Sequence, residues 1–155
     1  IYDFVGFSAS YAYTTVGDND ALAFGLGNGP GSYTLLPIRG PFVFTGYAGM
    51  NTHKLLFEYD FKEVGAEGLK AKLHLVKGKQ DAPHRNAGPT AANTHMNVKG
   101  WAAQASYDIP WVKGLSASVT YTALERKNFD AMGAVKKTDN NELWLQVGYK
   151  FNLLN

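Results

Sequence analysis

The sequence predicts an all-β protein, an antiparallel transmembrane β-barrel with about six to eight strands in 155 residues. First, six segments alternate apolar and polar side chains, which is the pattern of strands with one oily and one wet face. Second, each is about 10 to 14 residues long, enough to cross an apolar band of roughly 25 Å when tilted. Third, no stretch approaches the roughly 18 apolar residues of a membrane helix. Any membrane crossing must therefore use strands.

We expect the strands at residues 2–15, 52–62, 68–79, 95–109, 114–127 and 142–153. The apolar face of the first three carries large side chains, which are Val5, Phe7, Tyr11, Tyr13, Leu55, Phe57, Tyr59, Leu69, Leu73 and Leu75. The fourth and fifth carry Trp101, Tyr107, Ile109, Leu115, Val119 and Tyr121 among alanines. The last strand is the most regular, with Leu143, Leu145, Val147, Tyr149, Phe151 and Leu153 on one face. The opposite faces carry Ser, Thr, Gln, Lys and small residues, which suits a water-filled lumen.

The connections between these segments alternate in length. Residues 63–67 and 110–113 are short, whereas residues 16–51, 80–94 and 128–141 are long and rich in Gly, Asn, Asp and Pro. Short turns on one side and long loops on the other are typical of outer-membrane barrels. We expect residues 16–51 to form a long extracellular or lumen-folded loop in a single barrel segment covering residues 1–155.

Six strands are fewer than the eight of the smallest single-chain barrels, and an open sheet in lipid leaves unpaired backbone groups. Residues 32–36 and 42–48 are weak candidates for a hidden hairpin. The sheet could also close with other copies. Because the chain starts within the alternating pattern, we expect it to be the C-terminal part of a larger barrel.

Composition and spacing exclude several other functions. The chain has no cysteine, so it holds no disulfide or thiolate metal site. A net charge of +2 is too small to indicate nucleic acid. The four histidines lack metal spacing, and no serine sits in a nucleophile elbow. We expect no enzyme activity, no cofactor and no metal.

The predicted inner face carries the residues of greatest functional interest. We expect it to place charged and titratable side chains along a pore, namely Lys54, Glu58, Lys70, Lys72, His74, Arg126 and Lys150. Charges that ring a pore select ions and steer solutes. The alternative is that they are ordinary solvated charges paired with acidic neighbours. Arg39, in the long segment, is a candidate constriction charge or an ordinary loop residue.

Several short motifs resemble the C-terminal third of the OprD-type outer-membrane porins. They are "PIRGPFVFTGY" at residues 37–47, "FEYDF" at 57–61, "GLKAKLHLVKG" at 68–78 and the closing "NELWLQVGYKFNLL". The major porins of ε-proteobacteria are a near alternative. The resemblance implies a substrate-selective porin of roughly 18 strands in the bacterial outer membrane. It would contact outer-membrane lipid, pass small hydrophilic solutes such as amino acids, carboxylates and ions, and exist as a monomer or homotrimer.

A second function stays open at this point. A soluble β-barrel of the lipocalin or avidin kind would turn the same apolar face inward around a small ligand. Strand length and the alternation of loop lengths favour the pore.

Overall fold

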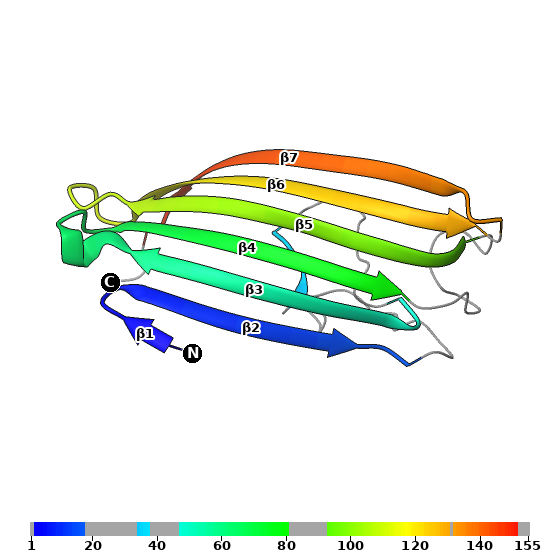
Figure 1. Ribbon diagram of the computed structural model, residues 1–155. Coiled ribbons are helices and arrows are strands. Elements are labelled where there is room, and N and C mark those ends of the chain that lie inside the picture. The colour runs from blue at the N-terminus through cyan, green and yellow to red at the C-terminus, as the bar shows by residue number, and fades with distance from the viewer. Residues whose placement is uncertain (1, 18–33, 38–46, 81–92, 131, 152–155) are drawn as a thin grey trace.

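The computed structural model of the chain describes residues 2–17, 34–37, 47–80, 93–130 and 132–151. Within them, seven strands form one antiparallel sheet in chain order (Figure 1). They are β1 (Tyr2–Phe4), β2 (Phe7–Thr15), β3 (Met50–Asp60), β4 (Leu69–Gln80), β5 (Asn93–Asp108), β6 (Leu115–Asp130) and β7 (Val135–Tyr149). A short 3₁₀ helix, η2 (Phe61–Val64), joins β3 to β4. The predicted all-β class and the antiparallel order are confirmed.

The sheet is open in the described part of the chain. β7 forms one edge, and at the other edge the short β1 pairs with only the first three residues of β2. The arrangement has the up-and-down order of a β-barrel, but among these strands β7 does not pair back to β1 or β2.

The strand register aligns the predicted faces across the whole sheet. Tyr11, Leu55, Leu75, Trp101 and Ala123 face one another in turn across five strands, β2 to β6. Residues that are paired in this way across the sheet form a row. Because side chains alternate between faces, all side chains of one row lie on the same side of the sheet, and those of the next row lie on the other side. We call the side that carries Tyr11 the outer face and the opposite side, which carries Lys54 and its row neighbours, the inner face.

Residues 34–37 lie against the inner face and cross it from β2 to β6. They make hydrogen bonds to Thr14 (3.0 Å), Lys54 (2.6 Å) and Thr122 (2.9 Å). In a flat sheet β2 and β6 are about 19 Å apart, whereas four extended residues cover only about 11 Å. The sheet therefore curls toward this segment, which makes the inner face concave.

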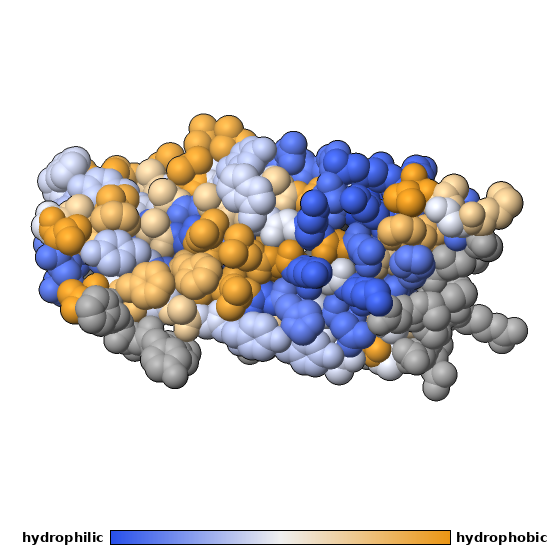
Figure 2. All heavy atoms as spheres, viewed as in Figure 1, coloured by the Kyte–Doolittle hydropathy of each residue, from blue (hydrophilic) through white to orange (hydrophobic). Residues whose placement is uncertain are grey.

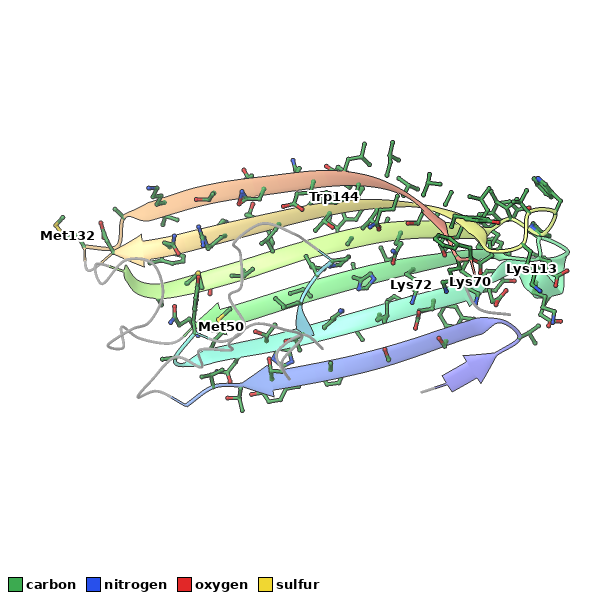
Figure 3. All side chains as sticks on the ribbon, turned by 180° about the vertical axis from the view of Figure 1, so that it is seen from behind. Met50, Lys70, Lys72, Lys113, Met132 and Trp144 are labelled. Atoms are coloured by element: carbon green, nitrogen blue, oxygen red, sulfur yellow. The ribbon has the colours of Figure 1, made fainter. Side chains whose placement is uncertain are left out.

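A small apolar cluster forms where this segment meets the sheet. Its buried members come from β3 to β6 and from the crossing segment, and they are Leu36, Met50, Val76, Met96, Val98, Ala102 and Leu124. Two glycines on the inner face make room for this cluster. Gly78 of β4 leaves space for the Met50 side chain, and Gly100 of β5 leaves space for that of Leu36. Met50 marks the end of the sheet that holds this cluster in Figure 3.

The first predicted strand, residues 2–15, is wrong as one continuous element. Val5 and Gly6 have positive φ angles of 31° and 78°, and this two-residue turn folds β1 back onto β2. Two-residue hairpins need positive φ at both central positions, which glycine adopts readily. Val5 and Gly6 continue the alternation of the flanking residues, so the alternation does not reveal this turn.

The predicted long loop at residues 128–141 is also wrong. β6 continues to Asp130 and β7 begins at Val135, so a tight turn joins them. The Asp130 carboxylate accepts hydrogen bonds from the backbone N–H groups of Met132 (2.9 Å) and Ala134 (2.8 Å), and Gly133 has a φ of 81°. The polar composition of residues 136–141 is that of a loop, but these residues form the loop-end part of β7 in a hairpin with β6.

The other predicted elements need smaller corrections. The strand predicted at 52–62 ends at Asp60, where the chain enters η2, and the closing strand ends at Tyr149 rather than residue 153. Of the weak hairpin candidates, residues 34–36 and 47–48 are not strands. Residues 32–33 and 42–46 lie outside the described residues.

Candidate functional site: the charged inner face

The structure places six of the predicted pore-lining residues on the inner face of the strands. The register puts Lys54 and Glu58 on β3, Lys70, Lys72 and His74 on β4, and Arg126 on β6, all on that side. Lys150 follows β7 at the turn end of the sheet. Arg39 lies outside the described residues. The shared face follows from the strand period, because all of these positions are even-numbered and the paired strands keep one parity.

The basic members lie in successive rows along the strands. From the loop end toward the turn end, the rows contain Arg126, then Lys54, then His74, then Lys72 and then Lys70. Consecutive rows on one face are about 6.7 Å apart along a strand. The inner face thus carries a line of positive or titratable groups over most of its length.

Two of these lysines face carboxylates across the β3–β4 pair. Lys72 forms an ion pair with Glu58, and Lys70 Nζ lies 3.7 Å from Asp60 Oδ2. All four side chains keep more than a third of their surface exposed. Ion pairs this exposed contribute little to stability, so the charges stay available to solutes. The interpretation of these residues as solvated, paired charges holds for these two lysines.

Lys54 and His74 differ from the others because each is only 8% exposed. The Lys54 ammonium donates a hydrogen bond to the Leu35 carbonyl oxygen at 2.6 Å. Neither ring nitrogen of His74 has a hydrogen-bond partner in the structure. Their predicted role as open pore lining is corrected here: they lie on the inner face but are covered by packing, which sequence alternation does not report.

A hollow of about 760 Å³ opens at the turn end of the sheet. Charged side chains from the ends of β3, β4, β5 and β7 line it, among them Asp60, Lys70, Asp108 and Lys150. The structure thus brings the predicted Lys70 and Lys150 to one place. Asp108, Glu67 and Ser116 also line the hollow and were missed as site residues. The even-numbered parity of Asp108 and Ser116 was the available signal.

Trp144 also lies on the inner face, as its position in the alternation predicts. It is opposite Thr120 in the register and points from β7 toward the concave side (Figure 3). Its indole Nε1 donates a hydrogen bond to Glu142 at 2.8 Å. A polar partner for the indole therefore comes from the same strand.

The outer face is apolar over the part nearer the short turns. On β7, Leu143, Leu145 and Val147 are 64%, 75% and 78% exposed. Large apolar side chains continue across the sheet, and the exposed ones include Phe7, Tyr11, Leu55, Leu73, Leu75, Trp101 and Val119. Figure 2 shows this apolar region giving way to hydrophilic residues toward the other end. A contiguous exposed patch of this kind marks contact with lipid or another protein.

Aromatic side chains gather at both ends of the apolar region. At the turn end they form the pairs Tyr59–Phe61, Tyr107–Trp111 and Tyr149–Phe151, with ring centroids 4.7 to 6.2 Å apart. At the loop end, Tyr13 packs on His53 at 4.8 Å and Trp101 on Tyr121 at 5.3 Å. Two aromatic belts separated by an apolar band are typical of membrane proteins.

Comparisons with protein-family models, curated proteins and solved structures found no match for this chain. Among the described residues, no cluster of His, Asp and Glu has the geometry of a metal site. The same residues contain no helix that is both long and apolar enough to cross a membrane.

Proposed function

We propose that this chain forms pore wall in a bacterial outer-membrane β-barrel that lets small hydrophilic solutes diffuse passively. One observation carries the proposal. The same sheet exposes large apolar side chains on its convex outer face and charged and hydroxyl side chains on its concave inner face. A membrane barrel with an aqueous lumen requires this division of the two faces.

The dimensions of the apolar face support a membrane location. Five successive rows of the outer face are apolar across most strands. The first contains Leu115 and Tyr149, and the fifth contains Leu75 and Trp101. They extend about 27 Å along the strands, or about 20 Å in height at a tilt near 40°. Side chains at both margins add to this height, which brings it near the roughly 25 Å of an outer-membrane apolar band.

A pore also requires that the sheet edges be paired. Each backbone N–H or C=O group left unpaired in hydrocarbon costs several kcal/mol. β7 and the part of β2 beyond β1 therefore need partner strands, either from further segments of the protein or from other copies. The up-and-down order of the seven strands allows such continuation at both edges.

The inner face would choose solutes by charge and size. Lys70, Lys72 and Lys150 offer positive charge, while Glu58, Asp60 and Asp108 balance it, so the lining suits zwitterionic or weakly anionic solutes such as amino acids and carboxylates. Residues 34–37 narrow the space over the inner face at the level of Lys54. Solute selectivity would then depend on the width of the passage beside this segment and on the exposed charged side chains of the inner face.

A soluble ligand-binding barrel fits the arrangement less well. In a lipocalin-like barrel the apolar face lines the interior and binds the ligand, whereas here the exposed large apolar side chains of β2 to β7 lie on the convex side, and the apolar cluster on the concave side is buried under residues 34–37. The concave side is polar over the half nearer the turns.

Ion selectivity in planar bilayers tests the pore. The protein should give stepwise single-channel conductance. Lys70→Glu on the inner face should change the reversal potential in a salt gradient in the direction of greater cation selectivity. Lys77→Glu makes the same charge change on the outer face and should leave the reversal potential unchanged. Folded protein that gives no conductance, or equal shifts from the two variants, would overturn the proposal.

A further inference from the structure

A lysine patch lies on the outer face immediately beyond the apolar region, at the loop end. It occupies two successive rows and consists of Lys77, Lys79, Lys99, Lys127 and Lys137. In the part of the chain that the structure describes, two carboxylates, Glu125 and Asp139, share these rows with the five lysines, so these strand residues carry an excess of positive charge. Figure 2 shows hydrophilic side chains gathered on this part of the face.

Three of the lysines converge on one point. The ammonium groups of Lys99, Lys127 and Lys137 lie 3.2, 3.7 and 2.9 Å from the carboxylate oxygens of Glu125. Lys137 also contacts Asp139 at 3.1 Å. Three ammonium groups around one carboxylate leave capacity for a second anion with several acceptor oxygens.

Two grooves open beside this point and share Lys99 and Glu125. One, of about 550 Å³, runs from Lys99 and Lys137 onto the apolar side chains of Leu75 and Trp101. The other, of about 310 Å³, lies between Lys77, Lys79 and Lys127. The first groove therefore has a cationic end and an apolar end, which is the polarity of a single lipid molecule.

We propose that the patch binds one membrane lipid with a phosphate-bearing headgroup, its phosphate among Lys99, Lys127 and Lys137 and its acyl chain along Leu75 and Trp101. The inference rests on the proposed function, because it requires the outer face to meet lipid. Lysines at a membrane surface attract anionic lipid by about 1 kcal/mol each. Trp101 lies at the boundary, where an aromatic side chain contacts both headgroup and chain.

Quenching of Trp101 fluorescence tests the site. In a Trp111→Phe, Trp144→Phe background, Trp101 is the remaining tryptophan. The protein in mixed micelles is titrated with phosphatidic acid or phosphatidylcholine, both brominated on the acyl chains. We expect the apparent affinity for phosphatidic acid to be at least about fivefold higher, which corresponds to about 1 kcal/mol.

Charge variants locate the preference. Lys99→Gln/Lys127→Gln/Lys137→Gln should bring the two lipids to equal affinity. The matched control, Lys62→Gln/Lys113→Gln/Lys136→Gln, removes the same charge outside the patch and should keep the preference. Glu125→Gln removes the carboxylate that competes for the lysines, so it should strengthen phosphatidic acid binding by about twofold or more. This variant tests the site even where the triple variant does not fold.

Each other outcome has a distinct meaning. Equal quenching by the two lipids in the parent protein would overturn the lipid site and leave the pore proposal standing. Displacement of phosphatidic acid by millimolar inorganic phosphate would show a free-phosphate site and overturn the lipid assignment. Absence of quenching by either lipid would show that the outer face does not meet acyl chains, and it would overturn both proposals.

Discussion

Lys54 of β3 donates a hydrogen bond from its ammonium group to the carbonyl oxygen of Leu35, at 2.6 Å. This contact joins the middle of the inner face to a segment that also bonds to β2 and β6. A lysine that strand alternation assigns to a water-filled lumen is therefore a tether for the chain that narrows that space.

Lys54→Met should loosen this tether while keeping the length of the side chain. Because hydrogen bonds to charged groups contribute about 1.5–3 kcal/mol, hydrogen exchange at residues 35 and 36 should accelerate by about tenfold or more. Single-channel conductance should rise as the segment leaves the inner face. For the exchange measurement the control is Lys70→Met, which removes an exposed ammonium group away from this segment. Unchanged exchange in Lys54→Met would show that Thr14 and Thr122 hold the segment without it.

Val147 and Gln146 are neighbours on β7 that face opposite sides, and arginine at each should have opposite effects. Val147→Arg puts a charge on the outer face in the second of the five apolar rows, and it should lower the free energy of unfolding in lipid by roughly 1–3 kcal/mol, because the cost of a charge falls from the midplane toward the interface. Gln146→Arg points inward and should be tolerated while changing conductance. Denaturant titration in vesicles gives the comparison, and equal tolerance at the two positions would contradict the assignment of faces.

The backbone of β7 offers a direct test of whether the sheet continues. An edge strand bonds through alternate residues only, whereas a strand paired on both sides has every N–H group engaged. If β7 pairs with a further strand, all amides from residue 136 to 149 should exchange as slowly as those of β5. Alternating fast and slow exchange along β7 would show a free edge and contradict a closed barrel.

Gly114 immediately precedes β6 and has a φ of 89°, and its carbonyl oxygen accepts a hydrogen bond at 2.8 Å from the backbone N–H of Lys150, which follows β7. A Cβ atom there would overlap the Lys150 carbonyl oxygen. Gly65 has nearly the same φ, 88°, but an open surrounding. Both alanine variants incur the left-handed backbone cost of about 1–2 kcal/mol, and Gly114→Ala should lose a further 1–3 kcal/mol, roughly, through overpacking. Equal losses in thermal unfolding would show that the β7 end yields to the methyl group.

The lysines around Glu125 should set how stability depends on pH. Hydrogen bonds from Lys137 and Lys99 lower the pKa of Glu125 from 4.5 to about 2, in the charged rows beyond the apolar region. A carboxyl with a lowered folded-state pKa stabilises the fold above its unfolded pKa and loses that contribution as pH falls toward the folded value. The stability difference between the protein and Glu125→Gln should therefore be constant above pH 4.5 and shrink between pH 4.5 and 2. A difference that does not change over this range would contradict the cluster.

Strand identity and the two faces were predictable because they depend on local alternation. Between Phe7 and Tyr149 the strand pairings keep odd residues opposite odd and even opposite even, except at the bulge where Asn93 pairs with Asp130, so Lys70 and Lys72 were predicted to share a face and do so. The turns were less predictable. The Asp130 carboxylate closes a turn by accepting hydrogen bonds from the backbone N–H groups of Met132 and Ala134. The residues around this turn are polar, and a long loop would have the same composition.

The sequence by itself determined the all-β class and which side chains of a strand share a face, because both follow from a period of two along the backbone. Only the tertiary structure decided that residues 34–37 cover Lys54, that Lys70 and Lys150 share one hollow, and that Lys99, Lys127 and Lys137 converge on Glu125. These relationships join residues far apart in the chain through register and curvature, and alternation within one strand carries no information about either.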